Sequence, residues 1–123
     1  MPARLSATVL DTPDPRGLAA FYGELLGWRV EEDSAEWVVL RPPGGGIGLS
    51  FQHESQHVRP TWPAEEDEQH MQLHLDIEVD DLETEVDRAV RLGASVADVQ
   101  PQQHVRVLLD PAGHPFCMFA VES

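Results

Sequence analysis

The sequence has little of three things: cysteine, positive charge and long apolar runs. Its single cysteine, Cys117, excludes a disulfide within the chain and favours a reducing compartment. Against 22 acidic residues there are only 8 Lys and Arg, a formal charge of −14, which argues against nucleic acid as a partner because phosphate binding needs clustered positive charge. No apolar run is long enough for a membrane span or a signal peptide, so we expect a cytoplasmic protein with no membrane partner.

What the sequence does contain is a regular order of strand and helix patterns. An alternating apolar pattern predicts a strand over 5–10. Asp14 followed by Pro15 predicts the start of a helix that ends at Gly27. Three further strands are expected over 28–32, 36–41 and 47–52.

The same order occurs a second time, after a polar, acidic stretch at 54–70 that we interpret as a linker or a lid. The second set comprises a strand over 72–79, a helix from Asp80–Asp81 to Gly93, and strands over 95–99, 104–109 and 116–121. A shift of 66 residues places one copy on the other, and neither copy alone can bury both faces of its sheet. We therefore predict one α+β domain over 1–123, in which two βαβββ modules, 1–53 and 71–123, pair into a curved eight-stranded mixed sheet around a cavity.

Three stretches of the sequence resemble the vicinal oxygen chelate superfamily, in particular its glyoxalase-like branch. They are Asp14–Pro15 through Phe21–Tyr22 to Trp28, His74–Ile77 through Asp80–Leu82 to Ala94, and Asp110–Cys117. The superfamily includes glyoxalase I, bleomycin resistance proteins and extradiol dioxygenases. The resemblance implies a cavity shared by both modules, a divalent metal often held there by four residues, and pairing into homodimers.

Whether the sequence predicts a metal site depends first on the face of the strand on which His74 lies. The two-residue period of a strand places His74, Asp76 and Glu78 on the face opposite the apolar residues that meet the helix. The resemblance also places a histidine ligand at His74. The matching position in the first strand is Thr8 by the repeat, or Ala7 by direct comparison, and neither side chain is a good ligand.

The remaining ligand positions fit a metal no better. The strand over 47–52 offers Ser50 and Gln52, and the last strand has Cys117 where the superfamily usually has a carboxylate. The donors left for a metal are His74 and, as weaker candidates, Cys117 and Gln52. We therefore expect no standard metal site, with His74 as the candidate ligand, and no cofactor. A divalent metal is left open as an alternative.

Residues 53–57 read H-E-x-x-H, the spacing of a zinc protease. That motif works on a helix, where residues four positions apart share a face. Here a strand precedes the motif and Pro60 follows closely, so the sequence predicts no such helix and no protease.

We therefore expect a protein that binds a small aromatic or cationic molecule without a standard metal site. Acidic charge and tryptophans suit such ligands through stacking and cation–π contact. The predicted pocket residues are Thr8, Trp37, Ser50, Gln52, His74, Asp76 and Cys117. Two alternatives stay open: a metal-dependent lyase, isomerase or dioxygenase, and a metal-free acid–base enzyme that uses His74 with Asp76 or Glu78.

Overall fold

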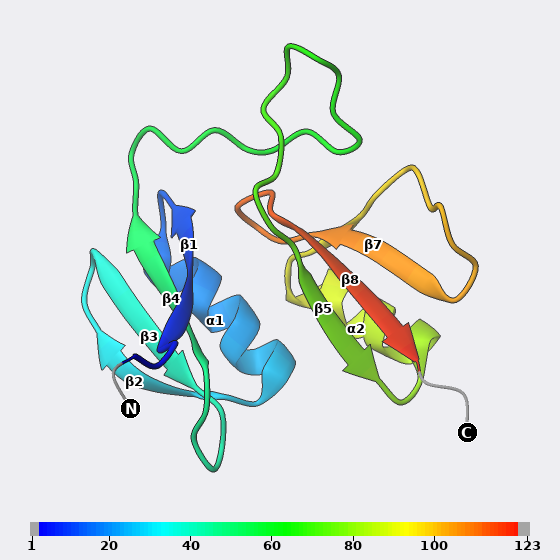
Figure 1. Cartoon of the computed structure of the whole chain (residues 1–123). Helices are drawn as coiled ribbons and strands as arrows, with labels where there is room; N and C mark the ends of the chain where they lie inside the picture. Colours follow the sequence, from blue (N-terminus) through cyan, green and yellow to red (C-terminus); the bar gives the residue numbers. More distant parts are fainter. Residues whose placement is uncertain (1–2, 121–123) are drawn as a thin grey trace. The chain divides into compact units, whose positions relative to one another are not determined.

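The computed structural model describes residues 3–120 (Figure 1). The chain divides into two compact units, a first that ends at His57 and a second that begins at Val58. The boundary lies within 54–70, the stretch predicted as a linker or lid, which contains no helix or strand. The strand predicted over 72–79 begins at Leu75. Within residues 3–120 there is no helix of the length and apolar character that a membrane crossing requires.

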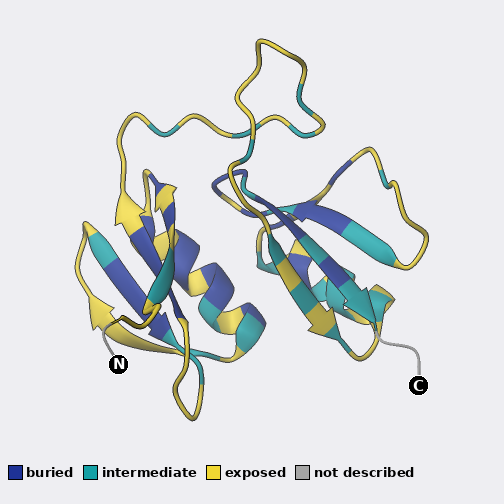
Figure 2. Ribbon diagram, viewed as in Figure 1, coloured by how far each residue is buried: buried dark blue, intermediate teal, exposed yellow. Residues whose placement is uncertain are grey.

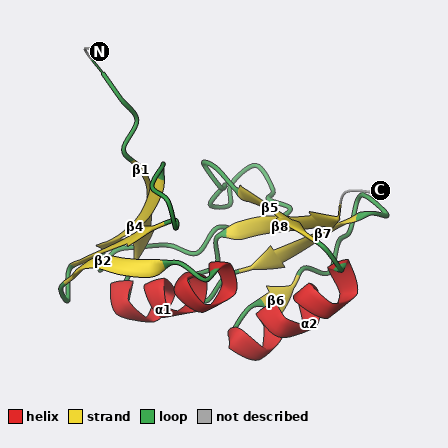
Figure 3. Cartoon of the chain, turned by 90° about the horizontal axis from the view of Figure 1, so that it is seen from below, coloured by secondary structure: helices red, strands yellow, loops and turns green. Residues whose placement is uncertain are grey.

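The first unit is a four-stranded sheet with one helix. Its elements are β1 (Ala7–Thr12), α1 (Pro15–Leu26), β2 (Arg29–Asp33), β3 (Trp37–Arg41) and β4 (Gly48–His53). The strand order is β1-β4-β3-β2, with β1 parallel to β4 and the other pairs antiparallel. In Figure 3, α1 covers one face of this sheet.

Capping and aromatic packing explain why α1 forms where it does. The Asp14 carboxylate accepts a hydrogen bond from the Gly17 amide at 3.1 Å, and Gly27 ends the helix with a φ of 70°. On the buried side, the ring of Tyr22 stacks on Phe51 of β4 with centroids 5.9 Å apart. Both side chains are fully buried, and in Figure 2 the buried colour marks positions on α1, β3 and β4. The helix and sheet of the first unit therefore share one aromatic core.

The second unit repeats this arrangement. Its elements are β5 (Leu75–Val79), α2 (Leu82–Leu92), β6 (Ser95–Val96), β7 (Val105–Leu109) and β8 (Pro115–Ala120). The order β5-β8-β7-β6 matches that of the first unit, and the pair β5–β8 is again parallel. Asp81 caps α2 by accepting a hydrogen bond from the Thr84 amide at 3.1 Å.

These observations confirm the predicted α+β fold built from two βαβββ modules. The eight strands form two separately hydrogen-bonded sheets of four, and neither sheet is closed. The predicted strand over 95–99 is shorter than expected, because only Ser95 and Val96 pair with β7. Val121, in the last predicted strand, lies outside the described residues.

The repeat is not a constant shift of 66 residues. The helix caps Asp14 and Asp81 are 67 positions apart, whereas Gly27 and Gly93 are 66 apart, because α1 has 12 residues and α2 has 11. For the strands that precede the helices, β1 and β5, the shift that superposes the two units is therefore 67 residues. Ala7, rather than Thr8, is the counterpart of the residue at position 74.

Candidate functional site

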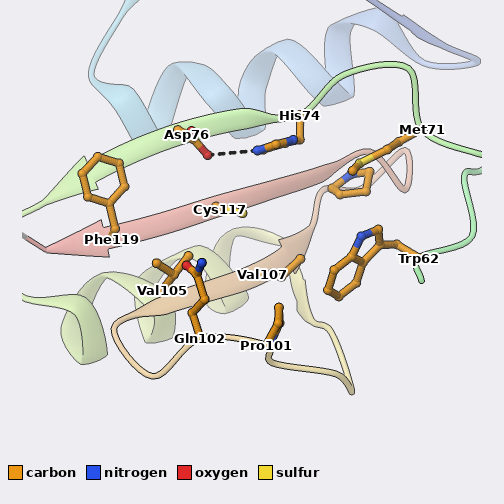
Figure 4. A pocket seen from close by; sticks show the side chains of 11 residues that line it. Trp62, Met71, His74, Asp76, Pro101, Gln102, Val105, Val107, Cys117 and Phe119 are labelled. Atoms are coloured by element: carbon orange, nitrogen blue, oxygen red, sulfur yellow. Dashed lines mark ion pairs between the residues drawn. The ribbon is translucent and has the colours of Figure 1, made fainter. Parts of the chain in front are cut away.

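The second unit contains a cavity of about 330 Å³ (Figure 4). Its size is at the lower end of the range for small-molecule sites. Most of the lining is apolar, with a few polar side chains on the β5 and β7 sides. The lining residues are Trp62, Met71, His74, Asp76, Pro101, Gln102, Val105, Val107, Pro115, Cys117 and Phe119.

The sheet register explains which side chains reach this cavity. On β8, Phe116 and Met118 are fully buried, and α2 packs against β7 and β8 from that side. Because side chains alternate along a strand, Cys117 and Phe119 point to the other face. Cys117 is paired in register with Asp76 of β5 and with Val107 of β7, so these three side chains lie across the floor of the cavity.

Loops complete the walls of the cavity. Trp62 and Met71 come from the segment before β5, and they lie at one end of the cavity in Figure 4, with Phe119 at the other. Pro101 and Gln102 come from the loop between β6 and β7 and line its lower side in that view. The cavity thus has aromatic side chains at both ends.

The polar corner of the cavity is formed by His74, Asp76 and Cys117. The His74 Nε2 atom lies 3.2 Å from Asp76 Oδ1, and one ligand atom from each of the three residues lies within 4.8 Å of the others. Burial raises the pKa of the Cys117 thiol, and the negative charge of Asp76 raises that pKa further. The thiol therefore stays protonated at neutral pH unless a cation replaces its proton.

This corner provides two kinds of chemistry. An imidazole oriented by a carboxylate can accept and return a proton, which is the arrangement required by metal-free acid–base catalysis. Imidazole nitrogen, thiolate sulfur and carboxylate oxygen are also the ligand atoms that zinc prefers, whereas magnesium and calcium prefer oxygen alone. His74, Asp76 and Cys117 therefore fit a zinc-like ion with three ligands from one unit.

The structure distributes the predicted pocket residues over both units. His74, Asp76 and Cys117 lie together in the cavity of the second unit. Glu78 is an exposed residue of β5 that does not line this cavity. The other four predicted pocket residues, Thr8, Trp37, Ser50 and Gln52, belong to the first unit.

Those four residues do not share one face of the first sheet. Trp37 is paired with Gln52 across β3 and β4, and Ser50 lies on the same face by alternation. Thr8 is paired with Leu49 and so shares the face of Phe51, which packs against α1. Ser50 is buried, with 2% of its surface exposed, although the sequence placed it on a polar face.

The sequence predicted that the H-E-x-x-H stretch forms no helix, and the structure confirms this. His53 is the last residue of β4, and the amide of His57 donates to the Glu54 carbonyl at 3.1 Å in a turn. Among residues 3–120, the one cluster of three potential metal ligands is that of His74, Asp76 and Cys117. Residues 53–57 therefore lack the helix on which the zinc-protease motif depends.

Several lining residues were not predicted from the sequence. Val105, Val107 and Phe119 follow from alternation along two expected strands, once Cys117 is placed on the cavity side. Trp62, Met71, Pro101 and Gln102 lie in loops, where no periodic pattern indicates direction.

Comparisons with known proteins agree with this fold. The sequence profile of the glyoxalase-like domain matches residues 7–119. A search of curated proteins finds no match. Among solved structures, a glyoxalase/bleomycin resistance protein/dioxygenase family enzyme from Burkholderia phytofirmans PsJN is similar with a TM-score of 0.75 and 20% identity, over 98% of this chain and 100% of that chain.

Two further similar structures are those of binding proteins. One is an antibiotic binding protein from Streptomyces sp. CB03234, with a TM-score of 0.64 and 17% identity over 98% of this chain and 97% of that chain. The other is a bleomycin-binding protein from Streptomyces verticillus in complex with copper(II)-bleomycin, with a TM-score of 0.58 and 18% identity over 99% of both chains. At these identities the similarity shows a shared fold.

Proposed function

Because this chain belongs to the glyoxalase-like domain family of the vicinal oxygen chelate superfamily, we propose that it is a small-molecule-binding protein that takes a planar aromatic, preferably cationic, ligand. One observation carries the proposal: a cavity of about 330 Å³ with an aromatic side chain at each end and a polar corner that contains the Asp76 carboxylate. Trp62 and Phe119 supply flat apolar surfaces, and Asp76 supplies a negative charge that is 63% exposed.

Charge favours a cationic ligand over an anionic one. The formal charge of −14 repels anions over the range of the Debye length, and the Asp76 carboxylate lies in the lining itself. Aromatic faces also attract cations through their quadrupole. Two proteins of similar fold are named an antibiotic binding protein and a bleomycin-binding protein, and these names support ligand capture as the activity proposed here.

A matched pair of probes tests this proposal. Proflavine is a planar three-ring cation, and anthracene-9-carboxylate is a planar three-ring anion of similar size. We expect proflavine to raise the melting temperature, since a ligand at one hundred times its Kd adds about 2.7 kcal/mol to the free energy of unfolding. The anion should bind more weakly. Equal binding of the two probes would contradict the cationic preference, and binding of neither would contradict the proposed function.

The polar corner favours a second candidate, a metal-dependent lyase, isomerase or dioxygenase. His74, Asp76 and Cys117 would hold the ion, which when bound supplies a Lewis acid to a substrate oxygen. Because the thiol must lose its proton to bind a metal, affinity should increase with pH. Titration with Co²⁺ should produce a thiolate-to-metal absorption band that Cys117→Ser abolishes. Absence of that band in the wild-type protein would contradict this candidate.

We also propose that the protein is a homodimer in the cytoplasm, as the family resemblance and the single cysteine suggest. β2 is an edge strand whose five residues are all exposed, and such edges are commonly protected by pairing. Light scattering that gives the mass of one chain, 13.7 kDa, would contradict the dimer.

A further inference from the structure

We propose that Arg59 is a positioning residue that fixes the Trp62 loop to the β7–β8 turn, so that the indole forms a preset wall of the cavity. This inference rests on the proposed binding function and deepens it. Arg59 does not line the cavity itself, and it would act on a ligand through Trp62.

The contact between Arg59 and the turn has a polar and an apolar part. Its Nη1 atom donates a hydrogen bond to the Pro111 carbonyl at 2.7 Å. Its aliphatic stem lies against Gly113, where an added Cβ would be 2.9 Å from Arg59 Cβ and 3.1 Å from Cγ. Gly113 has a φ of +90°, which a residue with a side chain rarely adopts. The turn therefore favours glycine both for its backbone conformation and for the close approach of Arg59.

The turn that receives Arg59 is held firmly. Asp110 is 1% exposed, and its Oδ1 atom accepts hydrogen bonds from the Ala112 amide at 2.9 Å and the His114 amide at 3.0 Å. The Gly113 amide donates to the Asp110 carbonyl at 2.8 Å. Pro115 follows this turn and lines the cavity. The turn that Arg59 contacts is therefore continuous with the cavity wall.

The loop side is also constrained. Trp62 follows Arg59 by three positions, and the Thr61 amide between them donates to the Gln69 carbonyl at 2.8 Å, which closes the base of the loop. Pro60 and Pro63 restrict the backbone on both sides of Thr61 and Trp62. Arg59 therefore links the hydrogen-bonded loop of Trp62 to the β7–β8 turn. A Trp62 side chain that is already in place before the ligand arrives lowers the entropy cost of binding.

Binding and exchange measurements on full-length variants test the role of Arg59. We expect Arg59→Ala to raise the Kd for proflavine about fivefold, the effect of one hydrogen bond. If Arg59 acts through Trp62, the same substitution in a Trp62→Ala background should leave the Kd unchanged. Arg59→Lys, which keeps the charge and the stem, should recover most of the affinity. Arg91→Ala is the control, because Arg91 is an exposed residue of α2, and this substitution should remove the same charge without a change in Kd.

Hydrogen exchange separates this inference from the proposed function, because it needs no ligand. In the free protein, Arg59→Ala should speed exchange of the Thr61 amide about fivefold, with amides of α1 unaffected. If the wild-type protein binds no probe but Thr61 exchange accelerates, the anchor holds and the proposed function fails. Unchanged Thr61 exchange would overturn the inference, and so would a full Arg59→Ala effect on Kd in the Trp62→Ala background.

Discussion

The two units share one topology but differ in how closely they are packed. Six residues of α1 are buried, among them Phe21 and Tyr22, whereas Ala89 is the one buried residue of α2. Phe51 of the first sheet stacks on Tyr22, and no such aromatic pair is found between α2 and its sheet within the described residues. The helix of the first unit is therefore more deeply buried against its sheet than the helix of the second.

The polar side chains of the candidate site lie on one copy of the repeat. Asp76 is paired with Cys117 in the second unit, and at a shift of 67 the same register pairs Val9 with Ser50 in the first. Ala7 takes the place of His74. The duplicated backbone therefore carries imidazole, carboxylate and thiol in one copy and no such groups at the same positions in the other.

The largest expected effect concerns the first unit. Phe51→Ala should lower the free energy of unfolding by about 3–5 kcal/mol, because it leaves a cavity beneath Tyr22. Denaturant unfolding at equilibrium measures this change. A loss below about 1 kcal/mol would mean that the aromatic core does not carry the stability of this unit.

Next comes a comparison of two tryptophans, one from each unit. Trp62→Ala should weaken proflavine binding by about 2 kcal/mol, roughly thirtyfold, through loss of stacking and buried area. Trp37→Ala should change Kd less than about threefold if the second unit alone carries the site. Fluorescence titration gives both constants. An equal loss for Trp37→Ala would extend the site to the first unit, as the sequence predicted.

A smaller effect is expected from the charge on β5. Asp76→Asn should weaken proflavine binding about threefold, since an exposed charge contributes little. It should not weaken binding of anthracene-9-carboxylate. Glu78→Gln is the matched control, because Glu78 lies on the same strand but outside the lining. If both substitutions weaken proflavine equally, the overall charge matters and the Asp76 position does not.

The smallest expected effect is on the rate at which the Cys117 thiol is alkylated. Burial and then the charge of Asp76 raise the pKa of Cys117, so less thiolate is present at pH 8 than for an ordinary cysteine. Alkylation by iodoacetamide should be slow at pH 8 and accelerate as pH increases. Asp76→Asn should lower that pKa in part and speed the reaction. A thiol that reacts as fast at pH 7 as at pH 9 would contradict the raised pKa.

Local chemistry made most of the fold predictable. Asp14 with Pro15 marks the start of α1, Gly27 and Gly93 mark the helix ends, and alternation identifies the strands. A single shift of 66 misplaced the first strand by one residue, because the helices differ by one residue in length. In a strand, an error of one residue moves every side chain to the wrong face.

The site was predictable only where it lies on strands. Alternation placed His74 and Asp76 on the face away from the helix, and Cys117 was predicted as a pocket residue from the family resemblance. The structure supplies the β5–β8 register that sets Cys117 beside Asp76. Trp62 and Gln102 were not predictable as wall residues, because both lie in loops without a periodic pattern. The loop of Trp62 is in addition held by a long-range contact, that of Arg59 with the β7–β8 turn.

Cys117 is the single cysteine of the chain and forms part of the cavity floor, so its alkylation reports on occupancy of the second unit alone. We expect proflavine at one hundred times its Kd to suppress alkylation of Cys117 almost completely, since about 1% of the protein then remains free. An alkylation rate unchanged by saturating proflavine would show that the ligand binds elsewhere and would contradict the proposed site.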